Sequence, residues 1–344
     1  MRILVTGGAG YIGSHACRRL LADGHTVVAL DNLSRGHRAP MDLLAARHPE
    51  LFAFVHADLG DRATVRATLE THAIDTVMHF GALAYVGESV EHPLRYYATN
   101  VGAGIALLDA IDRADAPIER FIFSSSCATF GDPPEGMIPV PEHCPQHPTS
   151  PYGRSKLHME QILSDLAIRR AREGRPIALS ILRYFNVAGA DPSGALGEDH
   201  DPETHLIPIA IQAALGKRDS VAIFGTDYPT PDGTCVRDYI HVEDLVDAHV
   251  RAMHQVTPGR TEPFNIGIGR GHSVREVLDS VRRVSGAEIP IREAPRRAGD
   301  AVALYADPER ITRRLGWSPH FTDLDDIVRT AWAWFRAHPR GYDG

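Results

Sequence analysis

Residues 3–13 read ILVTGGAGYIG, an apolar run that enters a glycine-rich turn. Three of the glycines are spaced three apart and a fourth completes the pattern GxGxxG: Gly7, Gly10, Gly13 and Gly8. Glycines at this spacing allow a tight turn, close approach of the backbone to a pyrophosphate, and packing of a helix on a strand. A helix over residues 14–22 would then present its first N–H groups to the phosphates. The stretch predicts a dinucleotide-binding strand–turn–helix unit.

Further apolar runs alternate with helical periodicity through the first half of the chain. Strands are predicted over 25–30, 52–55, 75–80, 121–123 and 177–182, and helices over about 63–72, 93–114 and 152–172. Continuous apolar strands separated by helices indicate a parallel sheet covered on both faces. We therefore expect an α/β fold, a Rossmann-type doubly wound sheet over 1–188. Glycine- and proline-rich loops after this point predict a smaller α+β domain over 189–344, with part of 236–268 returning to the first domain.

Polar and small residues stand where these strands end. Asp31 follows the second strand, at the distance where a carboxylate binds the adenosine ribose. Because a carboxylate there repels a 2′-phosphate, NAD is favoured over NADP, although Arg35 and Arg38 follow closely. Asp58, Gly81, Ser126 and Asn186 end later strands. Since ligands of such sheets bind at the carboxyl ends of strands, the sequence predicts one extended site along this edge.

Tyr152 and Lys156 are four residues apart at the start of the helix over 152–172. This spacing places both side chains on one helix face. A cation close to a phenol favours the phenolate and lowers the pKa of tyrosine, ordinarily about 10, by roughly one to three pH units. Tyr152 would then serve as a general base near neutral pH. Lysine occurs at only one other position, Lys217.

Composition excludes several classes of protein. The 344 residues carry a net charge of −8, which argues against nucleic acid as the main partner. No apolar run approaches the ~20 residues of a membrane helix, and the first residues lead into the glycine turn rather than a cleavable signal peptide. Four cysteines without metal-ligand spacing suit a reduced, cytoplasmic protein. The 19 histidines are scattered, and none is expected to pair with acids or cysteines at ligand spacing, so no metal is predicted.

The motifs together resemble a known family. TGGAGYIG at 6–13, Asp31, Ser126 and the Tyr152/Lys156 pair are similar to the extended short-chain dehydrogenase/reductase superfamily. The later stretches 86–90 (VGESV), 183–189 (RYFNVAG), 197–200 (GEDH), 233–241 (GTCVRDYIH) and 295–300 (PRRAGD) resemble the UDP-glucose 4-epimerases. The resemblance covers essentially the whole chain, in order.

This resemblance implies a mechanism. Tyr152 would take the proton of the sugar 4-hydroxyl while hydride passes to tightly bound NAD, and the hydride would return to the other face of a transient 4-keto sugar. Ser126 would hydrogen-bond the same oxygen, and Lys156 would bond the nicotinamide ribose. NAD would be regenerated in each cycle.

The resemblance also implies binding residues. Those expected at the cofactor are Gly7, Gly10, Tyr11, Ile12, Gly13, Asp31, Asn32, Asp58, Leu59, Phe80, Gly81, Ala82, Asn100, Ser124, Ser125, Tyr152, Lys156 and Tyr184. Those expected at the UDP-sugar are Ser126, Asn186, His205, Leu206, Ala222, Phe224, Arg237, Arg297, Asp300 and Leu304. Arg237 and Arg297 suit a diphosphate because guanidinium forks bind it bidentately, and Phe224 suits stacking on uracil. The helices over 93–114 and 152–172 would join two copies in a homodimer.

Three positions depart from the family pattern. Ala84 stands where many members carry a lysine, with Tyr85 next, so one cofactor contact is missing or replaced. Cys127-Ala128-Thr129 follows Ser126 and, with Ala84-Tyr85, also resembles UDP-pentose (xylose/arabinose) 4-epimerases. Leu304 stands where other members carry a tyrosine that excludes N-acetyl sugars or a small residue that admits them.

The residues around the predicted catalytic set also bear on other functions of the same fold. A 4,6-dehydratase needs an acid–base pair directly after the catalytic serine or threonine, and Cys127-Ala128 cannot supply it. A non-catalytic NAD-sensing protein has no need of Ser126, Tyr152 and Lys156 together. A dehydrogenase that releases NADH, a pentose epimerase and an N-acetylhexosamine epimerase stay open.

Overall fold

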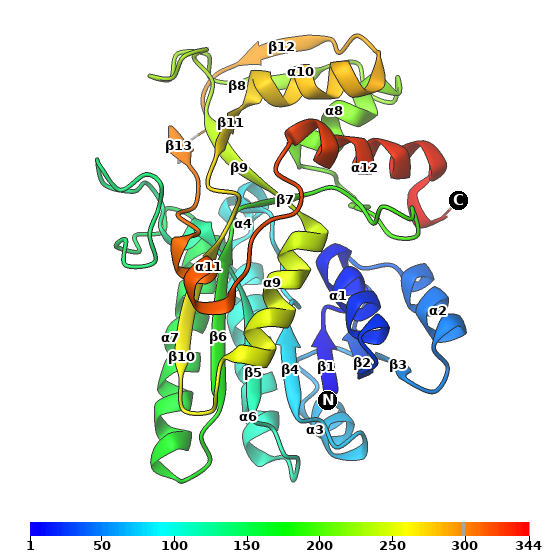
Figure 1. Ribbon diagram of the computed structural model, residues 1–344, viewed down its shortest axis with the longest axis vertical. Coiled ribbons are helices and arrows are strands. Elements are labelled where there is room, and N and C mark those ends of the chain that lie inside the picture. Colours follow the sequence, from blue (N-terminus) through cyan, green and yellow to red (C-terminus); the bar gives the residue numbers. More distant parts are fainter. Residues whose placement is uncertain (298–299, 344) are drawn as a thin grey trace. The chain divides into compact units, whose positions relative to one another are not determined.

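The computed structural model describes residues 1–297 and 300–343 (Figure 1), which divide into two compact units. Unit 1 comprises 1–129, 150–183 and 246–264, and unit 2 comprises 130–149, 184–245 and 265–344. Unit 1 thus includes a late segment inside the range 236–268, and unit 2 includes the early segment 130–149, which no sequence pattern set apart. The domain boundary at 188/189 stays a prediction.

Unit 1 is built on a seven-stranded sheet in the order β3-β2-β1-β4-β5-β6-β10. Its strands are β1 (Arg2–Thr6), β2 (Thr26–Asp31), β3 (Phe52–His56), β4 (Thr76–His79), β5 (Arg120–Ser126), β6 (Ala178–Tyr184) and β10 (Thr261–Ile266). The pairs β1–β2, β2–β3, β1–β4 and β4–β5 are parallel. The predicted doubly wound α/β fold is confirmed, and the order reverses between β1 and β4, where such sheets bind ligands.

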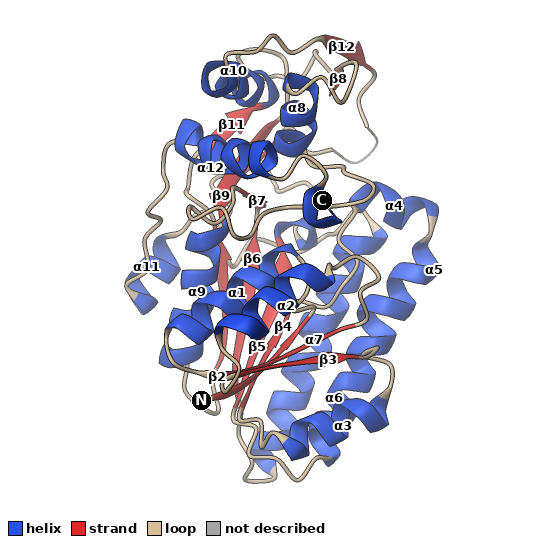
Figure 2. Ribbon diagram, turned by 90° about the vertical axis from the view of Figure 1, so that its right-hand side faces the viewer, coloured by secondary structure: helices blue, strands red, loops and turns tan. Residues whose placement is uncertain are grey.

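Helices cover both faces of this sheet (Figure 2). They are α1 (Tyr11–Ala22), α2 (Arg38–Arg47), α3 (Arg62–Thr71), α4 (Val86–Glu91), α5 (Pro93–Tyr96), α6 (Gly104–Arg113), α7 (Pro151–Arg172) and α9 (Val242–Gln255). One face carries α3, α6 and α7, whose apolar side chains form a buried core with the strands. On the other face α1 is tied to α9 by Arg19 and Asp247, 3.1 Å apart.

The helix predicted over 93–114 is continuous but irregular. A π-helical turn, Tyr97–Ala103, joins α5 to α6. A π-turn inserts one residue and is frequent at functional sites. Here it carries the buried Asn100.

The described residues of unit 2 form two small sheets and three longer helices. Its strands are β7 (Asn186–Ala188), β8 (Val221–Phe224), β9 (Val236–His241), β11 (Gly271–Ser273), β12 (Ile291–Ala294) and β13 (Ala303–Leu304), and its longer helices are α8 (Leu206–Ala214), α10 (Val274–Ser285) and α12 (Leu324–Ala337). The strand β9 pairs with β7, β11 and β13, and β8 pairs with β12. The three helices share one apolar core that includes the fully buried Trp334.

Helix α7 is anchored by a buried carboxylate. Glu160 accepts three hydrogen bonds of 2.7–3.2 Å from Arg183 on β6 and one of 2.5 Å from the Ser125 hydroxyl on β5. The side chains of Glu160 and Arg183 are only 4% and 7% exposed. The network fixes the middle of α7 against the ends of two strands. No helix among the described residues is both long and apolar enough to cross a bilayer.

We expect Glu160→Gln to lower the free energy of unfolding by about 3–5 kcal/mol, because it leaves the Arg183 guanidinium buried without its counter-charge. Urea unfolding measures the change. Asp42→Asn is the matched control, since it removes a carboxylate paired with Arg38 at the surface, where both side chains are more than half exposed, and such pairs contribute about 0–1 kcal/mol. Equal effects of the two substitutions would contradict the anchoring role.

Candidate functional site

The glycine turn brings the ends of β1 and β4 into direct contact. Gly7 has φ +69°, and a Cβ there would lie 2.6 Å from the backbone nitrogen of Gly81. A Cβ on Gly13 would lie 2.1 Å from the carbonyl oxygen of Gly7. Both positions therefore exclude side chains. The helix α1 begins directly after the turn, at Tyr11 rather than near Ser14, so its first N–H groups lie at the carboxyl end of β1.

Two carboxylates stand at the ends of β2 and β3. Asp31 accepts hydrogen bonds from the backbone N–H groups of Ala9 (3.1 Å) and Leu33 (2.8 Å). Burial raises the pKa of Asp31, while these two bonds act in the opposite direction. After the next strand, Asp58 accepts a 2.7 Å bond from the side chain of Asn32. One carboxylate therefore ends β2 and another follows β3, at the positions where the sequence predicted ribose and adenine contacts.

The other predicted cofactor residues lie at the same ends of strands. Gly10 caps α1, Tyr11 and Ile12 are in its first turn, Leu59 follows β3, Phe80, Gly81 and Ala82 follow β4, Ser124 and Ser125 are in β5, and Tyr184 ends β6. Sequence reasoning missed His79, which shares a 2.7 Å hydrogen bond with the Thr6 hydroxyl between β1 and β4. Burial and the charge of Lys156 lower the pKa of His79 to about 3, so this imidazole stays neutral.

The predicted catalytic residues of unit 1 meet where β4, β5 and α7 converge. Tyr152 is buried in an apolar cluster with Leu83, Tyr96 and Ala128. Its ring meets the Tyr96 ring edge-on at 6.4 Å. Ser126 ends β5, and its hydroxyl oxygen accepts a 3.1 Å bond from the N–H of Ala128. An apolar wall therefore holds the phenol of Tyr152, and a backbone donor orients the Ser126 hydroxyl.

Lys156 lies one turn further along α7 and is 4% exposed. Its Nζ donates a 2.8 Å bond to the carbonyl of Ser124 and lies 5.9 Å from the centre of the Tyr152 ring and 5.2 Å from that of Phe123. Burial lowers the pKa of the Lys156 amine to about 7, although Glu160 acts in the opposite direction. The two side chains therefore lie on one face of α7, as their spacing predicted, with the amine 5.9 Å from the ring centre.

Asn100, which is predicted to contact the cofactor, forms most of its hydrogen bonds within the protein. Its amide oxygen accepts from the N–H of Leu83, and its amide nitrogen donates to the carbonyl of Leu83 and to the hydroxyl of Ser155. Three of its four hydrogen-bonding positions are thus occupied. The structure makes Asn100 a clamp between the loop after β4 and α7, and its cofactor contact stays a prediction.

Ala84, at the position of the family lysine, is exposed, and Tyr85 beside it is buried. The N–H of Tyr85 donates to the hydroxyl of Tyr96, which in turn donates to Glu88 at 2.8 Å. The guanidinium of Arg35 lies 5.1 Å from the centre of the Tyr85 ring and 2.6 Å from Glu88. A cation from the loop after β2 therefore lies close to this departure from the family pattern.

In unit 2 the structure gathers several of the residues predicted for the nucleotide. Asp300 lies 2.9 Å from Arg297 and 3.7 Å from Arg237. The Arg297 guanidinium lies 4.8 Å from the centre of the Phe224 ring, which is 36% exposed and so available for stacking. Leu304 is the register partner of Arg237 across β13 and β9. Ala298 and Gly299 of the same motif lie outside the described residues.

The remaining predicted substrate residues lie on other elements of unit 2. Asn186 is in β7 beside Tyr239 of β9, Ala222 is in β8, and His205 and Leu206 stand at the N-terminus of α8. The predicted role of each stays a prediction.

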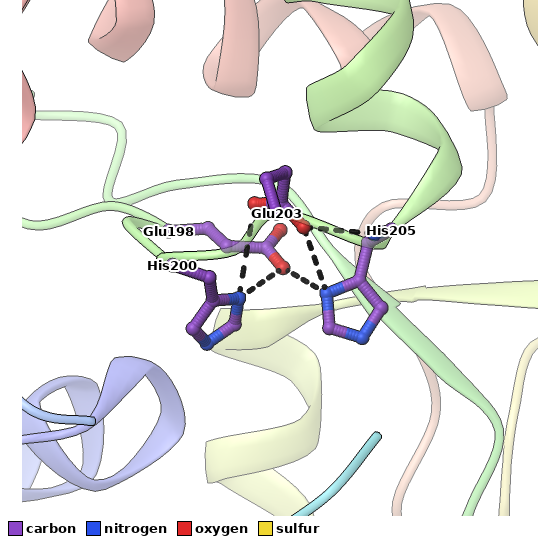
Figure 3. Close-up of side chains that lie close together, drawn as sticks. All are labelled: Glu198, His200, Glu203 and His205. Carbon is purple, nitrogen blue, oxygen red and sulfur yellow. Dashed lines mark hydrogen bonds and ion pairs between the residues drawn. The ribbon is translucent and has the colours of Figure 1, made fainter. Parts of the chain in front are cut away.

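The expectation that no histidine pairs with acids is wrong. Glu198, His200, Glu203 and His205 converge in unit 2 (Figure 3). Burial alone would lower the pKa of His205, but the charges of Glu198 and Glu203 outweigh it and raise that pKa. The four positions are spaced two, three and two apart, a pattern of neither helix nor strand, which is why the sequence did not reveal them.

Comparisons with known proteins show the family to which the chain belongs. The sequence model of the NAD dependent epimerase/dehydratase family matches residues 3–267. A UDP-glucose 4-epimerase of Halalkalibacterium halodurans is 46% identical over 343 residues, 99% of this chain and 98% of the relative. A probable UDP-arabinose 4-epimerase 3 of Oryza sativa subsp. japonica is 44% identical over 346 residues, 99% of this chain and 83% of the relative.

Among solved structures, the chain is similar to the UDP-glucose 4-epimerase of Bifidobacterium longum in complex with NAD⁺ and UDP. The TM-score is 0.93 at 36% identity, covering 99% of this chain and 100% of that one. The protein belongs to the NAD dependent epimerase/dehydratase family.

The stability of nucleotide-free protein should depend on pH through Lys156. Its pKa is about 7 when folded and about 10.4 when unfolded, so between these values the unfolded chain binds one proton more. Stability then rises with pH, by at most about 1.4 kcal/mol per pH unit. We expect Lys156→Met to remove this rise in urea unfolding at pH 7, 8 and 9. Lys217→Met, at the exposed second lysine, should keep it; equal slopes in wild type and Lys156→Met would contradict the assignment.

Proposed function

We propose that this protein is an NAD-dependent 4-epimerase that interconverts UDP-glucose and UDP-galactose through a transient 4-keto sugar. The observation that carries the proposal is the position of Tyr152, buried at the ends of β4 and β5 with the Lys156 amine 5.9 Å from its ring centre. Family membership and the relatives named above support the same reaction.

The residues around the glycine turn fit NAD. A side chain on Gly7 or Gly13 would collide with the backbone that forms the cradle, and the start of α1 offers N–H groups to a pyrophosphate. Asp31 and Asp58 would hold the adenosine end, and Ser124, Phe80 and Gly81 would line the nicotinamide end. Bound NAD supplies a hydride acceptor that returns the hydride to the same sugar carbon.

Residues of the chain itself would transfer the proton and bind the substrate. Tyr152 takes the proton from the 4-hydroxyl and returns it after the keto sugar has turned, while Ser126 hydrogen-bonds the same oxygen. In its protonated form the Lys156 amine favours the phenolate of Tyr152. Arg237 and Arg297 bind the diphosphate, and release from Asp300 would let their guanidinium groups fork onto it. Phe224 stacks on uracil.

A pentose substrate is the second candidate. The exposed Ala84, the buried Tyr85 and Cys127-Ala128-Thr129 fit the pattern shared with UDP-pentose epimerases, and curated UDP-arabinose 4-epimerases are among the similar relatives. Position 304, which in other members excludes or admits N-acetyl sugars, carries a leucine, so UDP-N-acetylhexosamines are also tested as substrates.

The test incubates purified protein with UDP-galactose and no added NAD, and follows both sugars by NMR and the absorbance of NADH. We expect UDP-glucose to form without accumulation of NADH. NADH accumulation would identify a dehydrogenase instead. Conversion of UDP-xylose or UDP-arabinose alone would establish the pentose reaction, and no conversion of any sugar after NAD is added would leave a binding protein.

Tyr152→Phe should lower turnover by about 10²–10⁴-fold, the usual contribution of a general base. NAD should remain bound, because the substitution keeps the ring and removes one hydroxyl. Turnover is measured on UDP-galactose, and bound NAD is measured after denaturation. Tyr97→Phe, on the π-turn, is the matched control. Full activity of Tyr152→Phe would end the proposed mechanism.

We also propose a homodimer in the cytoplasm. Five large apolar side chains are exposed on α4 to α7 of unit 1: Val86, Val90, Leu94, Ile105 and Ile168. Leu94 is 81% exposed and Val90 63%, which suits helices that pack against a second copy.

Leu94→Asp should shift the protein from dimer to monomer, because it places a charge in an apolar interface. Light scattering after size exclusion measures the mass. Arg47→Asp, an exposed position on α2, should stay dimeric. A wild type that is monomeric at micromolar concentration would contradict the proposal.

A further inference from the structure

Four side chains from one eight-residue segment converge in unit 2 (Figure 3). The segment runs from Glu198 to His205, between β7 and α8. One ligand atom from each of Glu198, His200, Glu203 and His205 lies within 4.8 Å of the others. The Nδ1 atom of His200 lies 3.2 Å from Glu198 Oε1 and 3.8 Å from Glu203 Oε2. The Nδ1 atom of His205 lies 2.6 Å from Glu198 Oε1 and 3.4 Å from Glu203 Oε1.

The converging atoms are shielded from solvent. The side chains of Glu198 and Glu203 are 4% and 2% exposed. The His205 ring is 40% exposed, but its Nδ1 atom is buried with that of His200. Two carboxylates buried together repel each other and lose hydration, so the site needs a compensating positive charge.

The two carboxylates use their oxygens differently. The backbone N–H groups of Thr204 and His205 both donate to Oε1 of Glu203, at 2.7 and 2.8 Å. These bonds fix the carboxylate so that Oε2 faces the cluster (Figure 3). Within the described part of the chain, Oε2 of Glu203 and Oε1 of Glu198 have no backbone or hydroxyl donor, and the polar atoms that approach them are the Nδ1 atoms of the two histidines. Both oxygens are deeply buried and directed at the same centre.

We propose that Glu198, His200, Glu203 and His205 bind one divalent transition-metal ion, with Zn²⁺ as the ion to test. Imidazole nitrogens and carboxylate oxygens are its usual ligands, at about 2.0–2.2 Å. A tetrahedral site with such bonds places its ligand atoms about 3.3 Å apart. The contacts of 3.2, 3.4 and 3.8 Å are close to that spacing, and only the 2.6 Å contact would have to open.

The charge of the site and the path of the loop both favour a bound dication. A dication with two neutral imidazoles balances two carboxylates, so the buried site becomes neutral. The loop is fastened just before the cluster, where the Tyr342 hydroxyl bonds the N–H and the carbonyl of Gly197. The metal would fasten its other end, since His205 directly precedes α8. A bound ion would therefore hold the whole loop and the orientation of the His205 ring.

The experiment uses untagged protein purified without chelator. Metal content is measured by mass spectrometry, and chelator-treated, dialysed protein is titrated with Zn²⁺ alone against a competing indicator. We expect about one zinc per chain and a raised thermal midpoint. Co²⁺ in place of Zn²⁺ should give the visible absorption of a four-coordinate site.

His200→Gln should weaken Zn²⁺ binding by at least about 10–100-fold, the loss usual for a damaged metal shell. Glu203→Gln is the second ligand variant, and circular dichroism checks that each variant is folded. His143→Gln, at an exposed histidine of unit 2, is the matched control and should bind as wild type does. Failure of wild-type protein to bind Zn²⁺, or equal affinity in both folded ligand variants, would overturn the proposal and leave a network of protonated histidines and carboxylates. These readouts do not depend on epimerase activity.

Discussion

Three elements of unit 1 meet at the carboxylate of Glu160. Arg183 on β6 donates to both of its oxygens, Ser125 on β5 donates to one, and α7 carries it. Because Tyr152, Lys156 and Glu160 follow each other at intervals of four, they share one helix face. Fixing Glu160 against two strand ends therefore fixes the other two as well. The positions of Tyr152 and Lys156 therefore depend on a buried ion pair further along the same helix.

The second constraint is the contact between β1 and β4. Where the strand order reverses, the backbones of Gly7 and Gly81 approach too closely for any side chain. Because no side chain rises from these positions, a dinucleotide can lie above the strand ends, with the N-terminus of α1 directed at its phosphates. Asn100 holds the loop after β4 to Ser155 of α7. The glycine turn and the start of α7 are thus parts of one hydrogen-bonded frame, which keeps the proposed cofactor site and the proposed base Tyr152 at a fixed distance from each other.

Much of this frame could be predicted from local patterns. The glycine turn, the buried strands and the Tyr152/Lys156 face each depend on spacing within a few residues, where helix and strand periods hold. Glu160 was missed although it continues the same interval of four, because its partners lie 23 and 35 residues away and a polar residue on a helix is ordinarily exposed. The π-turn around Asn100 adds one residue without any compositional sign. The contacts of His200 and His205 depend on the path of a loop, so the sequence has no periodic pattern that would predict them.

Two buried clusters among the described residues each place nitrogen atoms of basic side chains against a glutamate carboxylate, and they differ in geometry. At Glu160 both oxygens accept hydrogen bonds from groups that carry their own protons. Arg183 donates from Nε to both oxygens and from Nη2 to Oε2, and the Ser125 hydroxyl donates to Oε1. At Glu198 two imidazole nitrogens approach the same oxygen, and the second carboxylate turns its Oε2 to the same centre. Protons satisfy lone pairs one at a time, whereas a metal ion satisfies several from a single point. The first arrangement is that of an ion pair, and the second is that of a coordination shell.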